Sequence, residues 1–383
     1  MTLNLESEFP INDLSQSNAV TYLNHAAVAP WPLSSQKAVE AFARENVQTG
    51  AAGYLKWLDV EKELRSNLCK ILGTQHQESV ALVKNTSEAL SMVAYGLDWN
   101  EGDVVLISDE EFPSNRIVWQ SLASKGVQTI EVSLDKNQPE QSLINAIKKH
   151  KPRLLSISAV QYASGIRVDL AALGKTCKEN NVLYCVDAIQ SLGAMPFNCD
   201  DWQIDFSMAD GHKWLLGPEG LGVFYVAPHL LEKLDVYEFG WHMIENAGDY
   251  STKEWTIAKD ATRFECGSPN LLASHALNAS LKVLLEFGLD NIQNEIQEKI
   301  QYLKIELEKI GAEIISSTNE STSLGIICFK FNDTDSAKLY KDLMSQKVIC
   351  ANRGGGVRFS PHFHTTKEVM DNAITILKQL IQN

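Results

Sequence analysis

The chain has 383 residues, of which 44% are hydrophobic and 21% are charged, a composition that indicates a folded globular protein and not a disordered one. The formal net charge of -14 argues against nucleic acids and anionic membrane surfaces as partners. The length suits one large domain with a smaller one beside it.

The seven cysteines are odd in number, and no two of them have the CxxC spacing. We therefore expect no disulfide framework and no metal site, and a reducing, cytoplasmic location. The first residues, MTLNLESEFPINDL, lack the basic start and apolar centre of a signal peptide. No apolar run approaches the length of a membrane span, so we expect no membrane association.

Along the first two thirds of the chain, segments with apolar residues at helical intervals alternate with short, continuous apolar runs. Helices are predicted at 57–72, 86–97, 113–125, 139–150 and 169–180, and strands at 79–83, 103–108, 127–132, 153–159, 182–187, 204–209 and 221–226. This alternation is typical of an α/β fold with a mostly parallel sheet that is covered on both faces.

The pattern changes after Pro269. Long helices are predicted at 271–287 and 291–310, followed by a strand at 323–331, a helix at 335–346, strands near 348–352 and 356–360, and a helix at 366–381. We predict a large domain over residues 20–270 and a smaller α+β domain over residues 271–383, with residues 1–19 packing on the smaller domain.

Polar residues stand where several predicted strands end. Thr86 and Ser87 begin the helix after strand 79–83, where they either cap the helix or bind a phosphate. Asp187 ends strand 182–187 and either caps a turn or faces a cationic group. Phe112 is either core packing or a platform for an aromatic ring. Lys213 follows strand 204–209 and is either a surface lysine or an amine used in chemistry.

In parallel sheets, ligands bind outside the carboxyl ends of the strands. A phosphate site, an acid, an aromatic face and an amine at this edge suit pyridoxal 5′-phosphate (PLP). The amine forms a Schiff base, and the carboxylate keeps the pyridine nitrogen protonated so that the ring accepts electrons.

The chain resembles the class V aminotransferase family, which includes cysteine desulfurases, kynureninases and isopenicillin N epimerase-like proteins. The resemblance runs from YLNHAA at 22–27 to VRFSPHFHT at 357–365, and its most specific motifs are VDAIQ at 186–190, ADGHKWLLGPEGLG at 209–222 and RFECGSPN at 263–270. It implies a PLP-dependent type I fold, whose large domain has a mostly parallel seven-stranded sheet, and a homodimer with shared active sites.

The resemblance also implies roles for single residues. Lys213 carries PLP and moves the proton at the substrate α-carbon, and His212 lies beside the cofactor phosphate. Asp187 pairs with the pyridinium nitrogen, and Gln190 hydrogen-bonds the ring hydroxyl. The remaining cofactor contacts that it implies are Thr86 and Ser87 at the phosphate, Phe112 stacked on the ring, and Ser268 reaching the phosphate of the partner subunit.

Arg358 resembles the residue that holds the substrate α-carboxylate, because a planar guanidinium binds a carboxylate through two hydrogen bonds. Further candidates for substrate contact are Asn24 and Arg353, together with His25, Tyr54, Trp57, Trp241 and His242. One residue departs from the family pattern: Asp210 stands where many relatives have Ser or Thr. An acid repels a phosphate, so we expect Asp210 to turn away or to cap a turn.

The cofactor is easier to predict than the reaction. We expect an amino acid substrate and, first, amino-group transfer to a keto acid. A C–S β-lyase acting on cystine or a cysteine conjugate and an amino-acid epimerase are alternatives. A cysteine desulfurase is less favoured, because Cys350 stands in a predicted strand and not on a mobile loop before Arg358. A PLP-binding protein without catalysis is the least favoured alternative.

Overall fold

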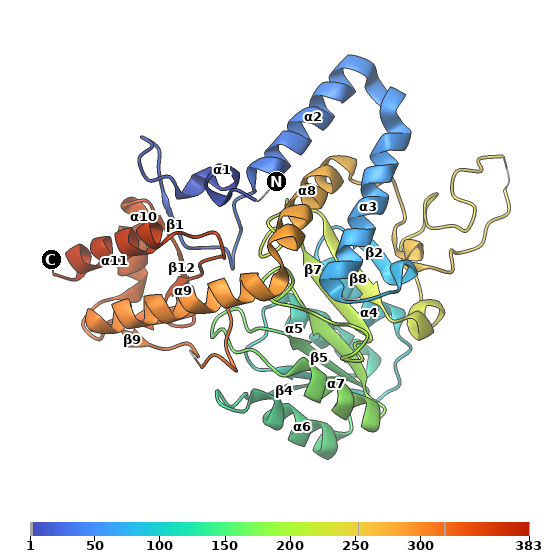
Figure 1. The fold of residues 1–383 in the computed structure, drawn as a ribbon. Coiled ribbons are helices and arrows are strands. Elements are labelled where there is room, and N and C mark those ends of the chain that lie inside the picture. Colours follow the sequence, from blue (N-terminus) through green and yellow to red (C-terminus); the bar gives the residue numbers. More distant parts are fainter. Residues whose placement is uncertain (1–2, 252, 318, 383) are drawn as a thin grey trace.

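A seven-stranded sheet forms the centre of the larger part of the molecule in the computed structural model, which describes residues 3–251, 253–317 and 319–382 (Figure 1). The strand order is β2-β8-β7-β6-β5-β3-β4. The strands are β2 (Val80–Val83), β3 (Val104–Ser108), β4 (Gln128–Val132), β5 (Leu154–Ser158), β6 (Leu183–Asp187), β7 (Phe206–Asp210) and β8 (Gly222–Val226).

The strands β4, β3, β5, β6 and β7 run parallel to one another, whereas β8 is antiparallel to both of its neighbours, β7 and β2. Every residue of β5, β7 and β8 is buried, as in a sheet covered on both faces. The predicted α/β fold with a mostly parallel seven-stranded sheet is confirmed.

Helices cover this sheet and extend beyond it. They are α2 (Leu33–Thr49), α3 (Tyr54–Leu72), α4 (Thr86–Gly96), α5 (Ser114–Gln120), α6 (Pro139–His150), α7 (Leu170–Glu179) and α8 (Leu271–Phe287). Figure 1 shows α2 and α3 leaving the body as an arm, and α8 packs against both. Helix α3 ends at Gly73, whose φ of 62° is left-handed, and a Cβ there would lie 2.2 Å from the carbonyl oxygen of Phe197, so only glycine fits.

The C-terminal part contains α9 (Leu289–Lys309), α10 (Ser336–Ser345) and α11 (Lys367–Ile381). They pack beside a four-stranded sheet of order β12-β13-β10-β9, formed by β9 (Glu313–Ile314), β10 (Ile327–Lys330), β12 (Ala351–Arg353) and β13 (Gly356–Phe359). A separate parallel pair joins β1 (Thr21–Tyr22) to β11 (Val348–Ile349). Short helices are α1 (Leu5–Glu8) and the 3₁₀ segments Pro10–Asn12, Gly50–Gly53, Gln77–Ser79, Ser121–Lys125, Pro228–Lys233 and Ala261–Phe264.

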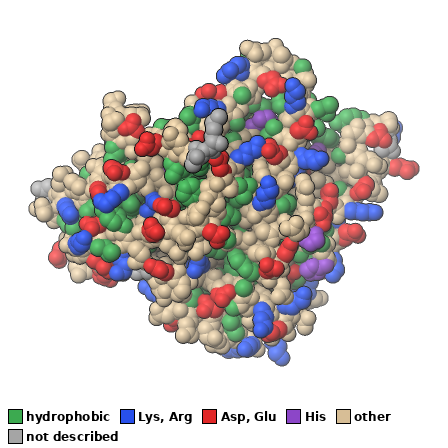
Figure 2. Space-filling view, viewed as in Figure 1, with side chains coloured by type: hydrophobic (Ala, Val, Ile, Leu, Met, Phe, Trp, Pro, Cys, Tyr) green, Lys and Arg blue, Asp and Glu red, His purple; other side chains and the backbone are tan. Residues whose placement is uncertain are grey.

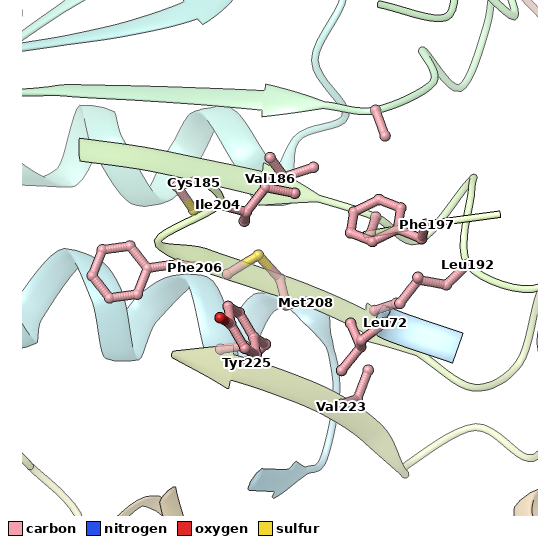
Figure 3. Close-up of a cluster of buried hydrophobic side chains, with 14 of the residues drawn as sticks. Leu72, Cys185, Val186, Leu192, Phe197, Ile204, Phe206, Met208, Val223 and Tyr225 are labelled. Atoms are coloured by element: carbon pink, nitrogen blue, oxygen red, sulfur yellow. The ribbon is translucent and has the colours of Figure 1, made fainter. Parts of the chain in front are cut away.

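Two hydrophobic clusters fill the interior. The larger one surrounds the seven-stranded sheet, and Figure 3 shows its side chains from β6, β7 and β8, such as Val186, Met208 and Val223. It also includes Leu277 and Leu281 of α8. The second cluster lies in the C-terminal part and includes Leu303, Phe329 and Phe359. The division into residues 20–270 and 271–383 stays a prediction.

The N-terminal segment lies against the end of the chain. The ring of Phe9 stacks on His364 with centroids 3.8 Å apart, and the Asn12 amide donates to the His364 carbonyl at 2.8 Å. On the surface, acidic and basic side chains are interspersed over the face that Figure 2 shows. None of the helices within the described ranges has the length and apolar character needed to cross a lipid bilayer.

Candidate active site

A cavity of about 360 Å³ lies where β6 and β7 end. Asp187 and Asp210, the last residues of these strands, both line it. Because the two strands are parallel, their carboxyl ends open at the same edge of the sheet. The cavity is therefore at the place that the sequence predicts for a ligand.

Lys213 enters this cavity from the turn that follows β7. Bonds from the Gly211 amide to the Leu221 carbonyl and from the Gly217 amide to the Gly211 carbonyl hold the turn. Lys213 is only 9% exposed, and its amine lies 5.6 Å from the centre of the Phe112 ring. Burial, aided by the charge of Arg358, lowers the pKa of Lys213 to about 8, so about a tenth of the amine is uncharged at pH 7, far more than for an ordinary lysine.

Asp187 is a buried acid that faces the amine. Its Oδ1 accepts a hydrogen bond from the Ile189 amide at 3.0 Å. Burial raises the pKa of Asp187, and the charge of Lys213 opposes this shift. Gln190 lies close by, where its Oε1 accepts from Trp214 Nε1 at 2.7 Å and its Nε2 donates to the Ala26 carbonyl at 3.0 Å. The Gln190 amide is thus fixed in the cavity wall.

The start of α4 forms another wall. Asn85 caps the helix by accepting from the Glu88 amide, and Thr86 and Ser87 are the first helical residues. The Ser87 hydroxyl donates to Ser114 Oγ at 2.8 Å. The free amides at such a helix start favour a phosphate group.

The sequence led us to expect that Asp210 turns away or caps a turn, and the structure places it in the cavity wall instead. It lines the cavity, and its backbone amide donates to Thr86 Oγ1 at 3.1 Å. The pairing of Asp210 with Gly222 and this bond to Thr86 fix the residue in the wall. His212 Nδ1 lies 3.1 Å from Asp210 Oδ1, but the two atoms are not aligned for a hydrogen bond, and both are buried without a partner.

Phe112 and Tyr162 both line the cavity and contact each other. Phe112, which is 41% exposed, makes an edge-to-face contact with Tyr162 at a centroid distance of 5.2 Å. Its ring is therefore accessible from the cavity, as a stacking platform must be.

Arg358 on β13 brings a cation to the cavity. Its Nη1 donates to the Tyr162 carbonyl at 2.7 Å, while its buried Nε has no hydrogen-bond partner. Burial lowers the pKa of Arg358 to about 10, so the guanidinium stays charged at neutral pH. Arg353 on β12 also lines the cavity, from a more exposed position. A buried guanidinium with an unused donor is suited to a carboxylate.

Some candidates lie elsewhere in the described part of the chain. Asn24 and Ser268 are not among the residues that line the cavity. Asn24 bridges to Ser360 through its backbone, and its Oδ1 is buried without a partner. Ser268 is exposed. The other candidates that do not line the cavity are His25, Tyr54, Trp57, Trp241 and His242.

The structure adds residues that the sequence did not single out. Tyr162 lies in the cavity wall and holds Arg358, and Glu219 and Ser114 also line the cavity. Tyr162 could have been found by the same reasoning as Asp187, because it follows the predicted strand 153–159. Glu219 stands within the motif ADGHKWLLGPEGLG, to which the resemblance assigns roles only at His212 and Lys213.

These groups fit PLP. A buried carboxylate faces a buried amine whose pKa is lowered to about 8, and polar atoms of Asp210, His212 and Arg358 without hydrogen-bond partners lie in the same region. Lys213 suits the Schiff base, Asp187 the pyridinium nitrogen, and the start of α4 the phosphate. No cluster of three potential metal ligands occurs among the residues that the structure describes.

Comparison with known proteins finds one matching family model and many similar chains, among them two relatives and one solved structure that are described below. The model of the family "Aminotransferase class-V" matches residues 21–370. A protein of Pyrococcus abyssi named "Probable cysteine desulfurase" is 26% identical, over 97% of this chain and 96% of its own. The "Uncharacterized aminotransferase YcbU" of Bacillus subtilis is 29% identical, over 81% of each chain. The solved structure of the cystine C–S lyase C-DES with its product cysteine persulfide superimposes with a TM-score of 0.87, at 22% identity, over 97% of this chain and 99% of that one.

Proposed function

The chain belongs to the class V aminotransferase family and is therefore a PLP-dependent enzyme, and on this basis we propose that it cleaves a C–S bond in a sulfur-bearing amino acid by β-elimination. The observation that carries the proposal is the position of the thiols. All seven cysteines lie in the described part of the chain, and none lines the cavity that contains Lys213. A desulfurase needs a thiolate that accepts the sulfur atom, whereas in a lyase the sulfur leaves with the rest of its group.

Two cysteines come nearest to a desulfurase thiol in sequence position or exposure. Cys350 precedes Arg358 but is 2% exposed between β11 and β12, and burial raises its pKa to about 12. Cys266 is partly exposed, and its sulfur lies 3.4 Å from Glu238 Oε2. Partial burial and this carboxylate raise the pKa of Cys266. Neither thiol is a good nucleophile at neutral pH.

The residues of the cavity suit the first steps of such a reaction. PLP supplies the electron-accepting ring that stabilises negative charge at the substrate α-carbon. Arg358 binds the α-carboxylate through its free Nε, and the Tyr162 carbonyl holds the guanidinium in place. Lys213, with its lowered pKa, takes the α-proton and later returns it. Asp187 keeps the pyridine nitrogen protonated.

The overall reaction balances without an external oxidant. A substrate R–S–CH₂–CH(NH₃⁺)–COO⁻ and one water give R–SH, pyruvate and ammonium. The Cβ–S bond and the Cα–H bond break, the sulfur leaves with the electron pair and takes up a proton, and water replaces the amino group. Polar leaving groups have access to Arg353 and Glu219 at the cavity wall.

Amino-group transfer, which the sequence favours first, is the second candidate. The similarity over 81% of the chain to a protein named as an aminotransferase supports it. Amino transfer and β-elimination share the removal of the α-proton, so the residues above serve both. The two reactions differ in their products and in the need for an acceptor.

The deciding experiment supplies the holoenzyme with cystine, S-methylcysteine, cysteine or alanine, with and without an added keto acid. A lyase releases pyruvate and ammonium from the sulfur compounds over many turnovers with no keto acid present. Turnover that requires the keto acid, with alanine as good a donor as cystine, contradicts the lyase and supports amino transfer. Alanine formed from cysteine supports a desulfurase. The variant Lys213→Ala gives the background rate.

We further propose that two copies form a homodimer in which Ser268 reaches the partner's cofactor phosphate. Ser268 is exposed and lies outside the cavity of its own chain. Glu265, three residues earlier, is buried and accepts from Arg65 at 2.6 Å, which fixes the start of the segment that carries Ser268. Analytical ultracentrifugation tests the dimer, and a monomeric holoenzyme with full activity would contradict it.

A further inference from the structure

Glu111 is a buried carboxylate behind the cavity that no role above includes. It is 5% exposed and accepts five hydrogen bonds. The donors are Ser108 Oγ at 3.0 Å, the Ser158 amide at 2.9 Å, Ser158 Oγ at 2.5 Å, Gln161 Nε2 at 3.0 Å and Asn115 Nδ2 at 2.8 Å. Three of these donors are N–H groups, which cannot accept a hydrogen bond from a protonated carboxyl and therefore favour the ionised form. Burial raises the pKa of Glu111, and the hydrogen bonds from Ser158, Gln161 and Asn115 oppose that shift.

The network continues into a second layer. Asn115 Oδ1 accepts from Trp119 Nε1 at 2.9 Å and from Ser156 Oγ at 2.6 Å. Glu111 and Asn115 therefore join the ends of β3 and β5 to helix α5. Such a network has few alternative arrangements, because each buried donor already has its acceptor.

The neighbours of this network in the chain are residues of the cavity. Glu111 directly precedes Phe112, and Gln161 directly precedes Tyr162. Phe112 is 41% exposed, so few contacts of its own fix its ring. The backbone that Glu111 anchors therefore determines where the Phe112 ring stands and where the Tyr162 carbonyl meets Arg358.

The charge of Glu111 acts on Asp187 as well. Ser158, which donates twice to Glu111, is paired directly with Asp187 between β5 and β6. None of the five donors to Glu111 carries a positive charge, so nothing in direct contact neutralises it. Its charge raises the pKa of Asp187 after the larger effect of burial, and Lys213 opposes this. Cys185 on β6 also faces Glu111, and its thiol pKa is raised, mainly by burial.

We propose that Glu111 is a positioning residue with two effects: it fixes the backbone that carries Phe112, and its negative charge strengthens the hold of Asp187 on a protonated pyridine nitrogen. This inference rests on the proposed contact between Asp187 and the cofactor, but not on which reaction follows. Two nearby negative charges stabilise the protonated form of the ring nitrogen, and this attraction is stronger in a site that excludes water. A buried acid without this role would serve only to join β3, β5 and α5.

The test compares two ligands of the apoprotein: PLP, and the analogue in which a carbon atom replaces the pyridine nitrogen. Their dissociation constants are measured by equilibrium titration, followed by absorbance, in wild type and in three variants. Glu111→Gln removes the charge and keeps the length. Glu111→Asp keeps the charge and withdraws the carboxylate by one methylene. Asp109→Asn, an exposed acid two residues earlier, is the control.

The wild type is expected to prefer PLP over the analogue. Glu111→Gln should reduce this preference about tenfold, the change that corresponds to one pKa unit. Glu111→Asp should weaken both ligands by the same factor, because it displaces Phe112 but retains the charge. Asp109→Asn should change neither. A preference that Glu111→Gln leaves unaltered, or that Glu111→Asp reduces as much, overturns the inference.

Two further outcomes are distinguishable. If Glu111→Gln does not fold, Ser158→Ala removes one donor to the carboxylate and should reduce the preference by a smaller factor, and an unchanged preference there counts against the inference. If the wild type binds neither ligand, the proposed function fails. Binding of both with equal affinity in every protein leaves PLP binding intact and rejects the role of Glu111.

Discussion

Three buried histidines predict that the fold weakens in mild acid. His25, His362 and His364 lie with ring centroids 4.9 to 5.5 Å apart, and each is at most 3% exposed. Burial lowers the pKa of His25 from 6.5 to about 4, and it lowers those of His362 and His364 well below 6.5. The folded state therefore holds neutral rings, whereas the unfolded chain takes up protons below about pH 6.5.

The size of the effect follows from the shift at His25. A lowered folded pKa means that stability is fully present above pH 6.5 and is lost as the pH falls towards 4. Between pH 7 and pH 5, His25 alone removes about 2 kcal/mol from the free energy of unfolding. The other two histidines add losses of the same sign. The cluster also contacts the chain beside the active lysine, since His362 Nε2 lies 3.1 Å from the Trp214 carbonyl.

The assay is urea unfolding of the PLP-saturated protein at pH 7 and pH 5, followed by tryptophan fluorescence. His25→Asn should reduce the pH-dependent loss by about 2 kcal/mol, whatever its stability at pH 7. The matched control is Phe363→Leu, which alters packing against His362 and His364 without removing a titrating group. It should be less stable at both pH values by the same amount. A loss in His25→Asn as large as in wild type would refute the reasoning.

Three more predictions concern the active site and its supports. Uptake of PLP by the apoprotein should accelerate with pH around a midpoint near 8, because the pKa of Lys213 is about 8; a stopped-flow absorbance series with a midpoint near the ordinary lysine value would contradict this. Arg358→Lys should raise KM roughly 10- to 100-fold for substrates with an α-carboxylate but not for a decarboxylated amine, and equal increases for both would reject the carboxylate contact. Glu265→Ala removes the carboxylate that forms two bonds to buried Arg65, so that only Glu61 remains to pair with Arg65, and it should lower the free energy of unfolding in urea by about 3 kcal/mol. The control Glu63→Ala removes an exposed ion pair with Lys282 and should lower it by less than about 1 kcal/mol.

Much of the fold was predictable because buried strands and amphipathic helices leave clear patterns. Helix α2 was missed because its only buried residue is Ser35, so it carries no apolar stripe that a sequence pattern reveals. The antiparallel direction of β8 was also not predictable from its apolar run, because such a run reads the same in both directions. The short connection from β7 to β8, without a helix, is what permits this direction.

The candidate site was predictable where chemistry depends on residue type at a strand end, as at Lys213 and Asp187. The site was less predictable where a contact is made by backbone atoms and not by a side chain. Tyr162 holds Arg358 through its carbonyl oxygen, which every residue has. Asp210 was expected to turn away from a phosphate or to cap a turn, yet strand pairing and its backbone bond to Thr86 fix it in the cavity wall. Glu111 reads as one of three consecutive acids in the sequence, and only the structure distinguishes it.

The central claim is that Lys213 carries the cofactor, and one measurement tests it directly. The holoenzyme is reduced with borohydride, digested, and the peptides are mapped by mass spectrometry. We predict one pyridoxyl-phosphate group per chain, attached to Lys213. Attachment to another lysine, or a chain that carries no such group after incubation with PLP, would contradict the account.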